Sequence, residues 1–179
     1  MTNADASPAI VPNFDSEVGA GRKIAFICSK GNLDMAYPGL ILANAALGEG
    51  AEVHLFFTFW GFDMINKKTM GNLKFSYLGN TAMHLPGQFG FSMPQGLAAL
   101  PGMTAVTTKM MNKQLADLDV PGVPEFLEII LASGGHLWAC KMSADMANLT
   151  EPDLYEGVEG IISATDMLEL AEGAQMLFI

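Results

Sequence analysis

The chain has 179 residues, which suits one domain with a substantial core. Half of the residues are hydrophobic, only 16% are charged, and the formal net charge is -10 at pH 7. An acidic chain repels phosphate backbones and anionic lipids, which argues against nucleic acid and membrane surfaces as partners. The high apolar content favours surface that is buried between subunits.

The first residues and the cysteines exclude several further classes. Residues 1–21 have no hydrophobic period, and we expect a flexible arm before a single domain at residues 22–179. The arm lacks the features of a signal peptide, and no window has the length and purity of a membrane span. The two cysteines form no CxxC pair and no Cys/His cluster, so we expect no metal site, no disulfide scaffold and a cytoplasmic protein.

Strand-like and helix-like segments alternate along the chain. In chain order we predict a strand at 23–28, a helix at 33–47, a strand at 52–60, a short helix and turn at 61–74, helices at 104–118 and 123–133, a strand at 136–140, a short helix at 141–149, a strand at 158–163, a helix at 164–173 and a strand at 174–179. Pro38 must lie in or near the first turn of its helix, or kink that helix. Residues 76–102 are rich in Gly, Pro, Phe and Met without a period, so we expect a long loop or insertion.

This alternation predicts an α/β protein with a flavodoxin-like, doubly wound sheet of about five parallel strands and helices on both faces. We expect the strand order 2-1-3-4-5. In such a sheet, ligands bind at the carboxyl ends of the strands, near the point where the strand order reverses.

Cys140 ends the third predicted strand and directly precedes a helix. It would lie on that edge, close to the free N–H groups of the helix start, which stabilise a thiolate. Lys141 would favour the thiolate, and Asp145 would oppose it if its carboxylate lay near. The alternative is that Cys140 only packs in the core, as free cysteines usually do.

Cys28 also ends a predicted strand. In the order 2-1-3-4-5 the first and third strands are neighbours, so Cys28 and Cys140 would approach each other. A bridge between them would need Cα atoms within about 7 Å, and most such proximities are incidental.

Two segments together resemble a known family. Residues 23–65, which include "FFTFWG", and the stretch "HLWACKMSADM" resemble the DsrE/DsrF-like sulfur-transfer proteins, in particular a subgroup with a C-x-M-S-x-D motif. The resemblance runs from about Lys23 to Ile179. It implies a flavodoxin-like fold, homo-oligomers and a cysteine that carries sulfane sulfur as a persulfide, which falls on Cys140.

The resemblance also implies the partners and the catalytic needs of the protein. The partners would be the sulfur donor and acceptor proteins of a relay, including TusA-like carriers, and thiol exchange needs no cofactor. The subgroup often has a longer apolar stretch in its middle; here the equivalent residues, 82–106, are broken by three prolines, so we expect no membrane attachment.

Other residues are candidates for the lining of the site. We favour helix capping for Ser143 and Asp145, with a hydrogen bond from Ser143 to the sulfur as the alternative. Aromatic cover would come from the end of the second strand, and loop residues would line the same edge; these candidates are Phe59, Trp60, Phe62, Ser29, Gly31, Asn32 and Asp34. Lys30 is either a solvated charge or an anion contact, and His54 and His136 are expected to satisfy core hydrogen bonds.

Two further functions remain open on the sequence alone. One is a small-ligand-binding module in which Cys140 only packs. The other is an oligomeric interaction module that needs no thiol.

Overall fold

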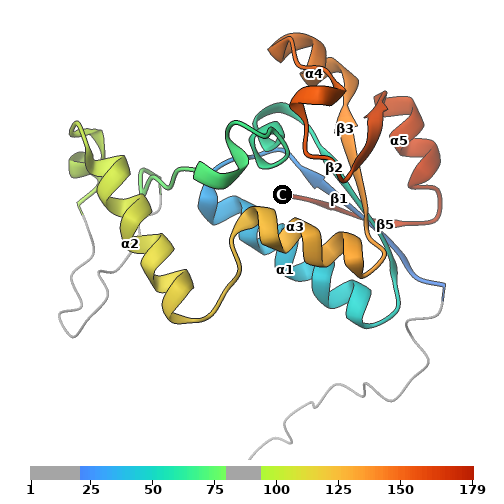
Figure 1. The fold of residues 1–179 in the computed structure, drawn as a ribbon, viewed down its shortest axis with the longest axis horizontal. Helices are drawn as coiled ribbons and strands as arrows, with labels where there is room; N and C mark the ends of the chain where they lie inside the picture. The colour runs from blue at the N-terminus through green and yellow to red at the C-terminus, as the bar shows by residue number, and fades with distance from the viewer. Residues whose placement is uncertain (1–20, 80–93) are drawn as a thin grey trace, which may run out of the picture.

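The computed structural model describes residues 21–79 and 94–179 (Figure 1). The expected arm at residues 1–21 therefore lies outside the described residues except for its last position. Of the expected loop at 76–102, residues 80–93 also lie outside them. Within the described ranges, no helix is long and apolar enough to cross a membrane.

Five parallel strands form a single sheet in the order β4-β3-β2-β1-β5. The strands are β1 (Lys23–Cys28), β2 (Glu52–Phe57), β3 (His136–Cys140), β4 (Val158–Ile162) and β5 (Gln175–Phe178). The predicted α/β class and five-stranded parallel sheet are confirmed. The predicted order 2-1-3-4-5 placed β1 between β2 and β3 and is wrong, because β2 lies between β1 and β3. The order reverses only after β4, where the chain crosses back to place β5 beside β1.

The central position of β2 follows from its composition. Every residue of β2 after Glu52 is buried, whereas every residue of β5 is at least partly exposed. A strand with both faces covered is apolar on both faces, and an edge strand need not be. The strand predicted at 52–60 ends at Phe57, and Phe59 and Trp60 beyond it are exposed.

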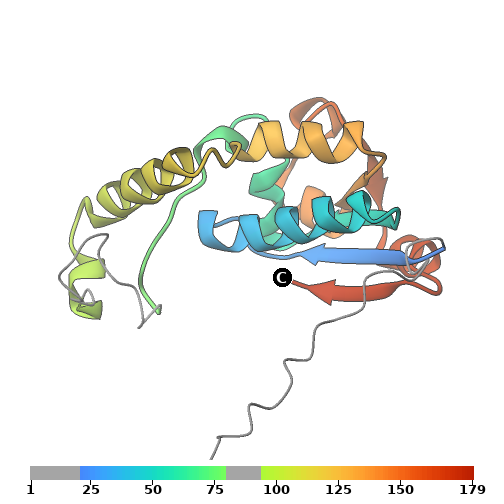
Figure 2. The same ribbon diagram turned by 90° about the horizontal axis from the view of Figure 1, so that it is seen from below.

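Helices cover both faces of the sheet. The helices α1 (Leu33–Gly48) and α3 (Val123–Ala132) lie together over one face, as Figure 2 shows. The connection from β4 to β5 runs across the sheet in the opposite sense, and right-handed crossovers therefore place α5 (Ala164–Leu170) on the other face. That face carries only this short helix between the described strands.

The main core lies between the sheet and the pair α1 and α3. Its fully buried side chains include Phe26, Leu40, Phe57, Leu127 and Ile130. Burial of each such side chain stabilises the fold by about 1.5–3 kcal/mol. Pro38 lies just past the first turn of α1, where it leaves the Asp34 carbonyl without its usual helical donor.

The remaining elements are short or project from the sheet. Two 3-10 turns, η1 (Phe59–Met64) and η2 (Met70–Asn72), replace the short helix predicted at 61–74. A third, η3 (Gln95–Ala99), precedes α2 (Met103–Asp117), which extends away from the sheet in Figures 1 and 2. The helix α4 (Lys141–Ala147) follows β3 directly, and η4 (Glu151–Asp153) follows α4.

Candidate functional site

The strand order separates the two cysteines. Cys28 pairs in register with Phe57, and Phe57 pairs with Ala139. Side chains that pair in register point to the same face, so Cys140, one residue further on, points to the opposite face. Two strand spacings of about 4.8 Å also separate β1 from β3, and this distance exceeds the Cα separation that a disulfide can bridge. The expected approach of Cys28 to Cys140 is therefore wrong.

Cys28 is a packing residue in this fold. Its sulfur lies beneath α1, where a Cβ atom at Gly39 would be 3.8 Å away. Burial raises the pKa of the Cys28 thiol to about 12. A thiol in such an environment stays protonated and is a poor nucleophile at neutral pH.

Cys140 lies at the wall of an apolar cavity on the other face of the sheet. The residue is only 4% exposed, and the cavity beside it has a volume of about 590 Å³. Its lining spans the carboxyl ends of the strands and the starts of two helices, and comprises Phe56, Thr58, Phe59, Cys140, Lys141, Met142, Asp145, Ser163, Ala164 and Phe178. The sulfur is therefore reached from solvent at this cavity and not at an open surface.

Hydrogen bonds to the sulfur set the acidity of Cys140. Burial raises the pKa of this thiol, but hydrogen bonds from the backbone of Ser143, the hydroxyls of Thr58 and Ser143, and the backbone of Met142 lower it. The hydrogen bonds outweigh burial, and the pKa of Cys140 lies below its ordinary value of 9.0. A thiolate is the nucleophilic form, so Cys140 is activated and Cys28 is not.

Ser143 connects the two elements that enclose the sulfur. Its hydroxyl oxygen accepts a hydrogen bond of 2.7 Å from the Phe59 backbone N–H and lies 3.2 Å from the Thr58 hydroxyl. The single Ser143 proton donates to the sulfur, as the lowered pKa of Cys140 requires, when Thr58 is not its acceptor. The expected capping role is wrong, since Cys140 is the N-cap of α4 and the Ser143 oxygen accepts from Phe59 and not from an N–H group of that helix.

Lys141 and Asp145 pair with each other at the rim of the cavity. Their ammonium and carboxylate groups are 3.2 Å apart, and both side chains are largely exposed. The pairing of charges reduces the influence of either one on the sulfur, and exposed pairs of this kind contribute little energy. Asp145 does not cap the helix.

The other expected lining residues lie elsewhere on the same edge. Gly31, Asn32 and Trp60 line a separate, neighbouring cavity. The Ser29 hydroxyl donates to the Ile179 carbonyl at 2.9 Å, and Asp34 accepts from the Asn32 amide. Phe62 is buried in the core, and among the expected aromatic residues only Phe59 reaches the cavity beside Cys140.

Phe56, Thr58, Met142, Ser163 and Phe178 are lining residues that the sequence reasoning missed. Phe178 pairs in register with Ile27, which pairs with Phe56, so these side chains share one face of the sheet. Phe178 reaches this face because β5 lies beside β1. The sequence pattern of a strand does not predict which strand it will lie beside. Thr58 had a usable signal, because it lies inside the "FFTFWG" segment.

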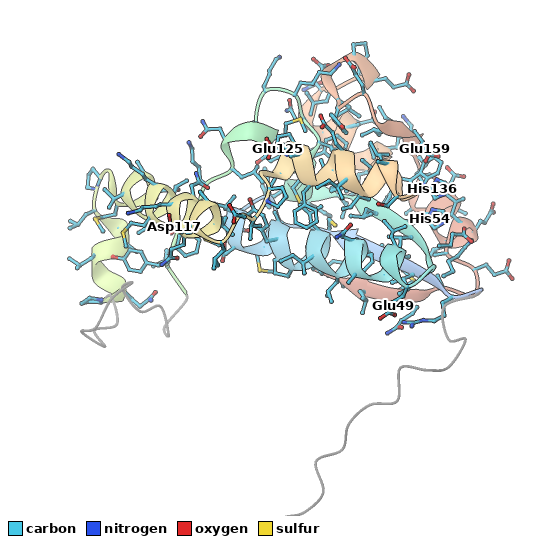
Figure 3. All side chains as sticks on the ribbon, turned by 60° about the horizontal axis from the view of Figure 1, so that its bottom comes forward. Glu49, His54, Asp117, Glu125, His136 and Glu159 are labelled. Atoms are coloured by element: carbon cyan, nitrogen blue, oxygen red, sulfur yellow. The ribbon has the colours of Figure 1, made fainter. Side chains whose placement is uncertain are left out.

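His54 and His136 lie at the opposite end of the strands. The His54 and His136 rings stack with centroids 4.8 Å apart, and Figure 3 labels them beside Glu159. His54 accepts a 3.2 Å hydrogen bond from the Trp138 indole, and its other nitrogen meets Glu52 at 2.8 Å. The expectation that His54 satisfies a core hydrogen bond is confirmed. In the described part of the chain, no three His, Cys, Asp or Glu side chains converge on a metal position.

Comparisons with known proteins place this chain in a family. The model of the DsrE/DsrF/DrsH-like family matches residues 20–179. A protein of Allochromatium vinosum named sulfur carrier protein DsrE2 is 36% identical over 138 residues, which are 77% of this chain and 86% of the relative. The uncharacterized protein YrkE of Bacillus subtilis is 26% identical over 162 residues, which are 88% and 97% of the two chains.

A solved structure shares the fold. The crystal structure of the ychN protein from E. coli aligns with a TM-score of 0.50 at 13% identity, over 88% of this chain and 99% of that one. At this identity the likeness shows the fold alone.

Proposed function

Because the chain belongs to the DsrE/DsrF/DrsH-like family, we propose that it is a sulfur carrier that holds sulfane sulfur as a persulfide on Cys140. The relative named as a sulfur carrier supports a role in sulfur trafficking. The observation that carries the assignment to Cys140 is the contrast between the two thiols. The pKa of Cys140 is lowered by hydrogen bonds at a cavity, whereas burial raises the pKa of Cys28.

Sulfur transfer through Cys140 is thiol exchange. The Cys140 thiolate attacks the outer sulfur of a donor persulfide, the donor's S–S bond breaks, and the donor leaves as a thiolate while Cys140 gains the sulfur atom. The acceptor's thiolate then attacks the outer sulfur on Cys140, and Cys140 leaves as a thiolate. Each step forms one bond and breaks one, with no net oxidation, so no cofactor is required.

A lowered pKa helps both steps. It raises the thiolate fraction for the attack on the donor, and it makes Cys140 a better leaving group when the acceptor attacks. The hydroxyls of Thr58 and Ser143 donate to the Cys140 sulfur and so stabilise the thiolate that attacks in the first step and leaves in the second. The Ser143 hydroxyl is held in place by the hydrogen bond that its oxygen accepts from the Phe59 backbone N–H.

The apolar lining protects the stored sulfur. Phe56, Phe59 and Phe178 surround the cavity and limit water and dissolved oxidants near the terminal sulfur. A protein donor or acceptor, such as a TusA-like relay protein, would therefore present its cysteine on a flexible segment. A small-molecule donor or acceptor would enter the cavity directly. A cytoplasmic location stays a prediction.

Exposed apolar residues beside the cavity support the proposed homo-oligomer. Phe178 is 76% exposed. Leu168 and Met176, on the side of the sheet that carries α5, are also exposed. Exposed large apolar side chains on one face favour an interaction surface there. A second copy on this face would also narrow the access to Cys140.

Differential alkylation tests the contrast between the thiols. Native protein is treated with iodoacetamide, quenched, unfolded and labelled with a second reagent, and the two peptides are then separated by mass. We expect the first label on Cys140 and the second label on Cys28. Native labelling of neither thiol would contradict the reactive role and favour packing for both.

A further inference from the structure

A second cavity at the carboxyl edge gathers basic residues. Its volume is about 500 Å³, and its lining includes Lys30, Lys68 and Lys74, which are three of the nine Lys and Arg residues in the chain. Among the described residues that line it, Asp63 is the only acidic one. This lysine cavity therefore has a positive wall in a protein whose formal net charge is -10.

The three ammonium groups are poorly neutralised by the protein. Within residues 21–79 and 94–179, Lys30 has no hydrogen-bond or ion-pair partner. Lys74 donates to the neutral Asn72 amide oxygen at 2.6 Å, and Lys68 lies 4.0 Å from Asp153. Like charges that share one concave wall repel each other, and a bound anion relieves that repulsion.

The backbone positions beneath these lysines are fixed. A Cβ atom at Gly31 would lie 2.1 Å from the Trp60 carbonyl oxygen, so the loop after β1 sits directly against η1. The Leu33 backbone N–H donates to the Lys74 carbonyl at 2.9 Å, and the Thr69 hydroxyl donates to the Asp63 carbonyl at 2.9 Å. Three chain segments are thus joined around one cavity, which lowers the entropic cost of gathering their charges on a ligand.

We propose that the lysine cavity binds a small oxyanion with two or more negative charges, of the phosphate or sulfate type. Its volume lies within the usual range of ligand cavities, which are concave, whereas protein partners bind flatter surfaces. Lysines serve as point charges for such anions. The anion is either free or attached to a planar group, which the exposed indole of Trp60 would stack against.

This binding is separate from sulfur storage. The lining of the lysine cavity does not include Cys140, although Trp60 directly follows Phe59, which lines the other cavity. The two activities can therefore be lost independently, and persulfide loading of Cys140 serves as an internal check of the fold.

Calorimetric titration tests the proposal with two probes. Pyrophosphate represents the free anion, and ADP represents the same chemistry on a planar base. We compare wild type with the double variant Lys30→Gln/Lys74→Gln, and with the control Lys109→Gln/Lys113→Gln, which removes equal charge from exposed positions on α2. We expect the cavity variant to lose affinity by about tenfold or more, and the control to stay within about twofold.

Two further arms test the planar group and the charge dependence of binding. Trp60→Leu is expected to weaken ADP but not pyrophosphate if the planar group contributes, and to change neither if the free anion is the ligand. Raising the salt from about 50 to about 500 mM must weaken wild-type binding, because exposed charges are screened. No binding of either probe, equal affinity in both double variants, or salt-independent binding would overturn the proposal.

Discussion

The Ser143 hydroxyl accepts a 2.7 Å hydrogen bond from the Phe59 backbone N–H, and this contact joins α4 to the start of η1 beside the Cys140 sulfur. Phe59 itself has a φ of 47°, a left-handed conformation that non-glycine residues seldom adopt. The conformation aims its N–H at Ser143. The same serine oxygen thus satisfies a backbone donor and directs its proton to the thiol.

Ser143→Ala is expected to reduce the acidity of Cys140. The change removes one donor to the sulfur and an indirect support for Thr58, so the pKa of Cys140 rises toward its ordinary value. The pH profile of iodoacetamide alkylation should therefore shift to higher pH. The loss of an acceptor for the Phe59 N–H should also lower the free energy of unfolding by about 1–3 kcal/mol.

Two variants separate acidity from stability. Thr58→Val keeps the side-chain shape and removes only the hydroxyl, so the alkylation profile should shift in the same direction. Ser133→Ala, at the exposed end of α3, should leave the profile unchanged. An unshifted profile in both Ser143→Ala and Thr58→Val would mean that these hydroxyls do not tune the thiol.

Cys28 is expected to make the fold sensitive to alkaline pH. Its pKa is raised from 9.0 to about 12, so the folded state keeps the proton while the unfolded state releases it. The stabilisation is complete below pH 9 and is lost as the pH rises toward 12, at up to about 1.4 kcal/mol per pH unit. Urea unfolding should show a smaller decline in stability between about pH 9 and about pH 10.5 in Cys28→Ala than in wild type.

The two proteins are compared by the slope of unfolding free energy against pH, because Cys28→Ala also leaves a small cavity beneath α1. That cavity lowers stability at every pH. Tyrosines and lysines titrate equally in both proteins and cancel in the difference. Parallel curves for the two proteins would show that Cys28 is not held in its protonated form.

The bounds of the strands could be predicted from the sequence better than the order of the strands in the sheet. The run at 23–28 and the run at 136–140 became β1 and β3 with the expected bounds, because short apolar runs bounded by turns have few other structures. Their separation by β2 could not be predicted. The period of a strand reports which faces are buried, but not which strand lies beside it.

The candidate site shows the same division. The position of Cys140 before a helix follows from local sequence, and it proved to be the N-cap of α4. The partners of Ser143 depend on Thr58 and Phe59, 85 and 84 residues earlier in the chain. A contact of that sequence separation follows from the sheet order, so helix capping was the better guess for Ser143 from its neighbours alone.

The proposed assembly predicts a mass above 19.1 kDa for the wild-type particle. Phe178→Glu places a charge on the exposed apolar face beside the cavity and should shift light-scattering mass toward that of one chain. Leu118→Glu changes an equally exposed side chain, 74% against 76%, at the far end of α2 and should leave the mass unchanged. A wild-type mass of one chain would contradict the homo-oligomer.

Intact-mass spectrometry after incubation with polysulfide tests the central claim most directly. Wild type and Cys28→Ser should each gain the mass of a sulfur atom, which a reductant such as dithiothreitol removes, and Cys140→Ser should gain none. Cys28→Ser is the matched control, because Cys28 is the other thiol of the same fold and does not line the cavity. Uptake of sulfur by Cys140→Ser at the wild-type stoichiometry, or by none of the three proteins, would contradict the assignment of Cys140 as the sulfur carrier.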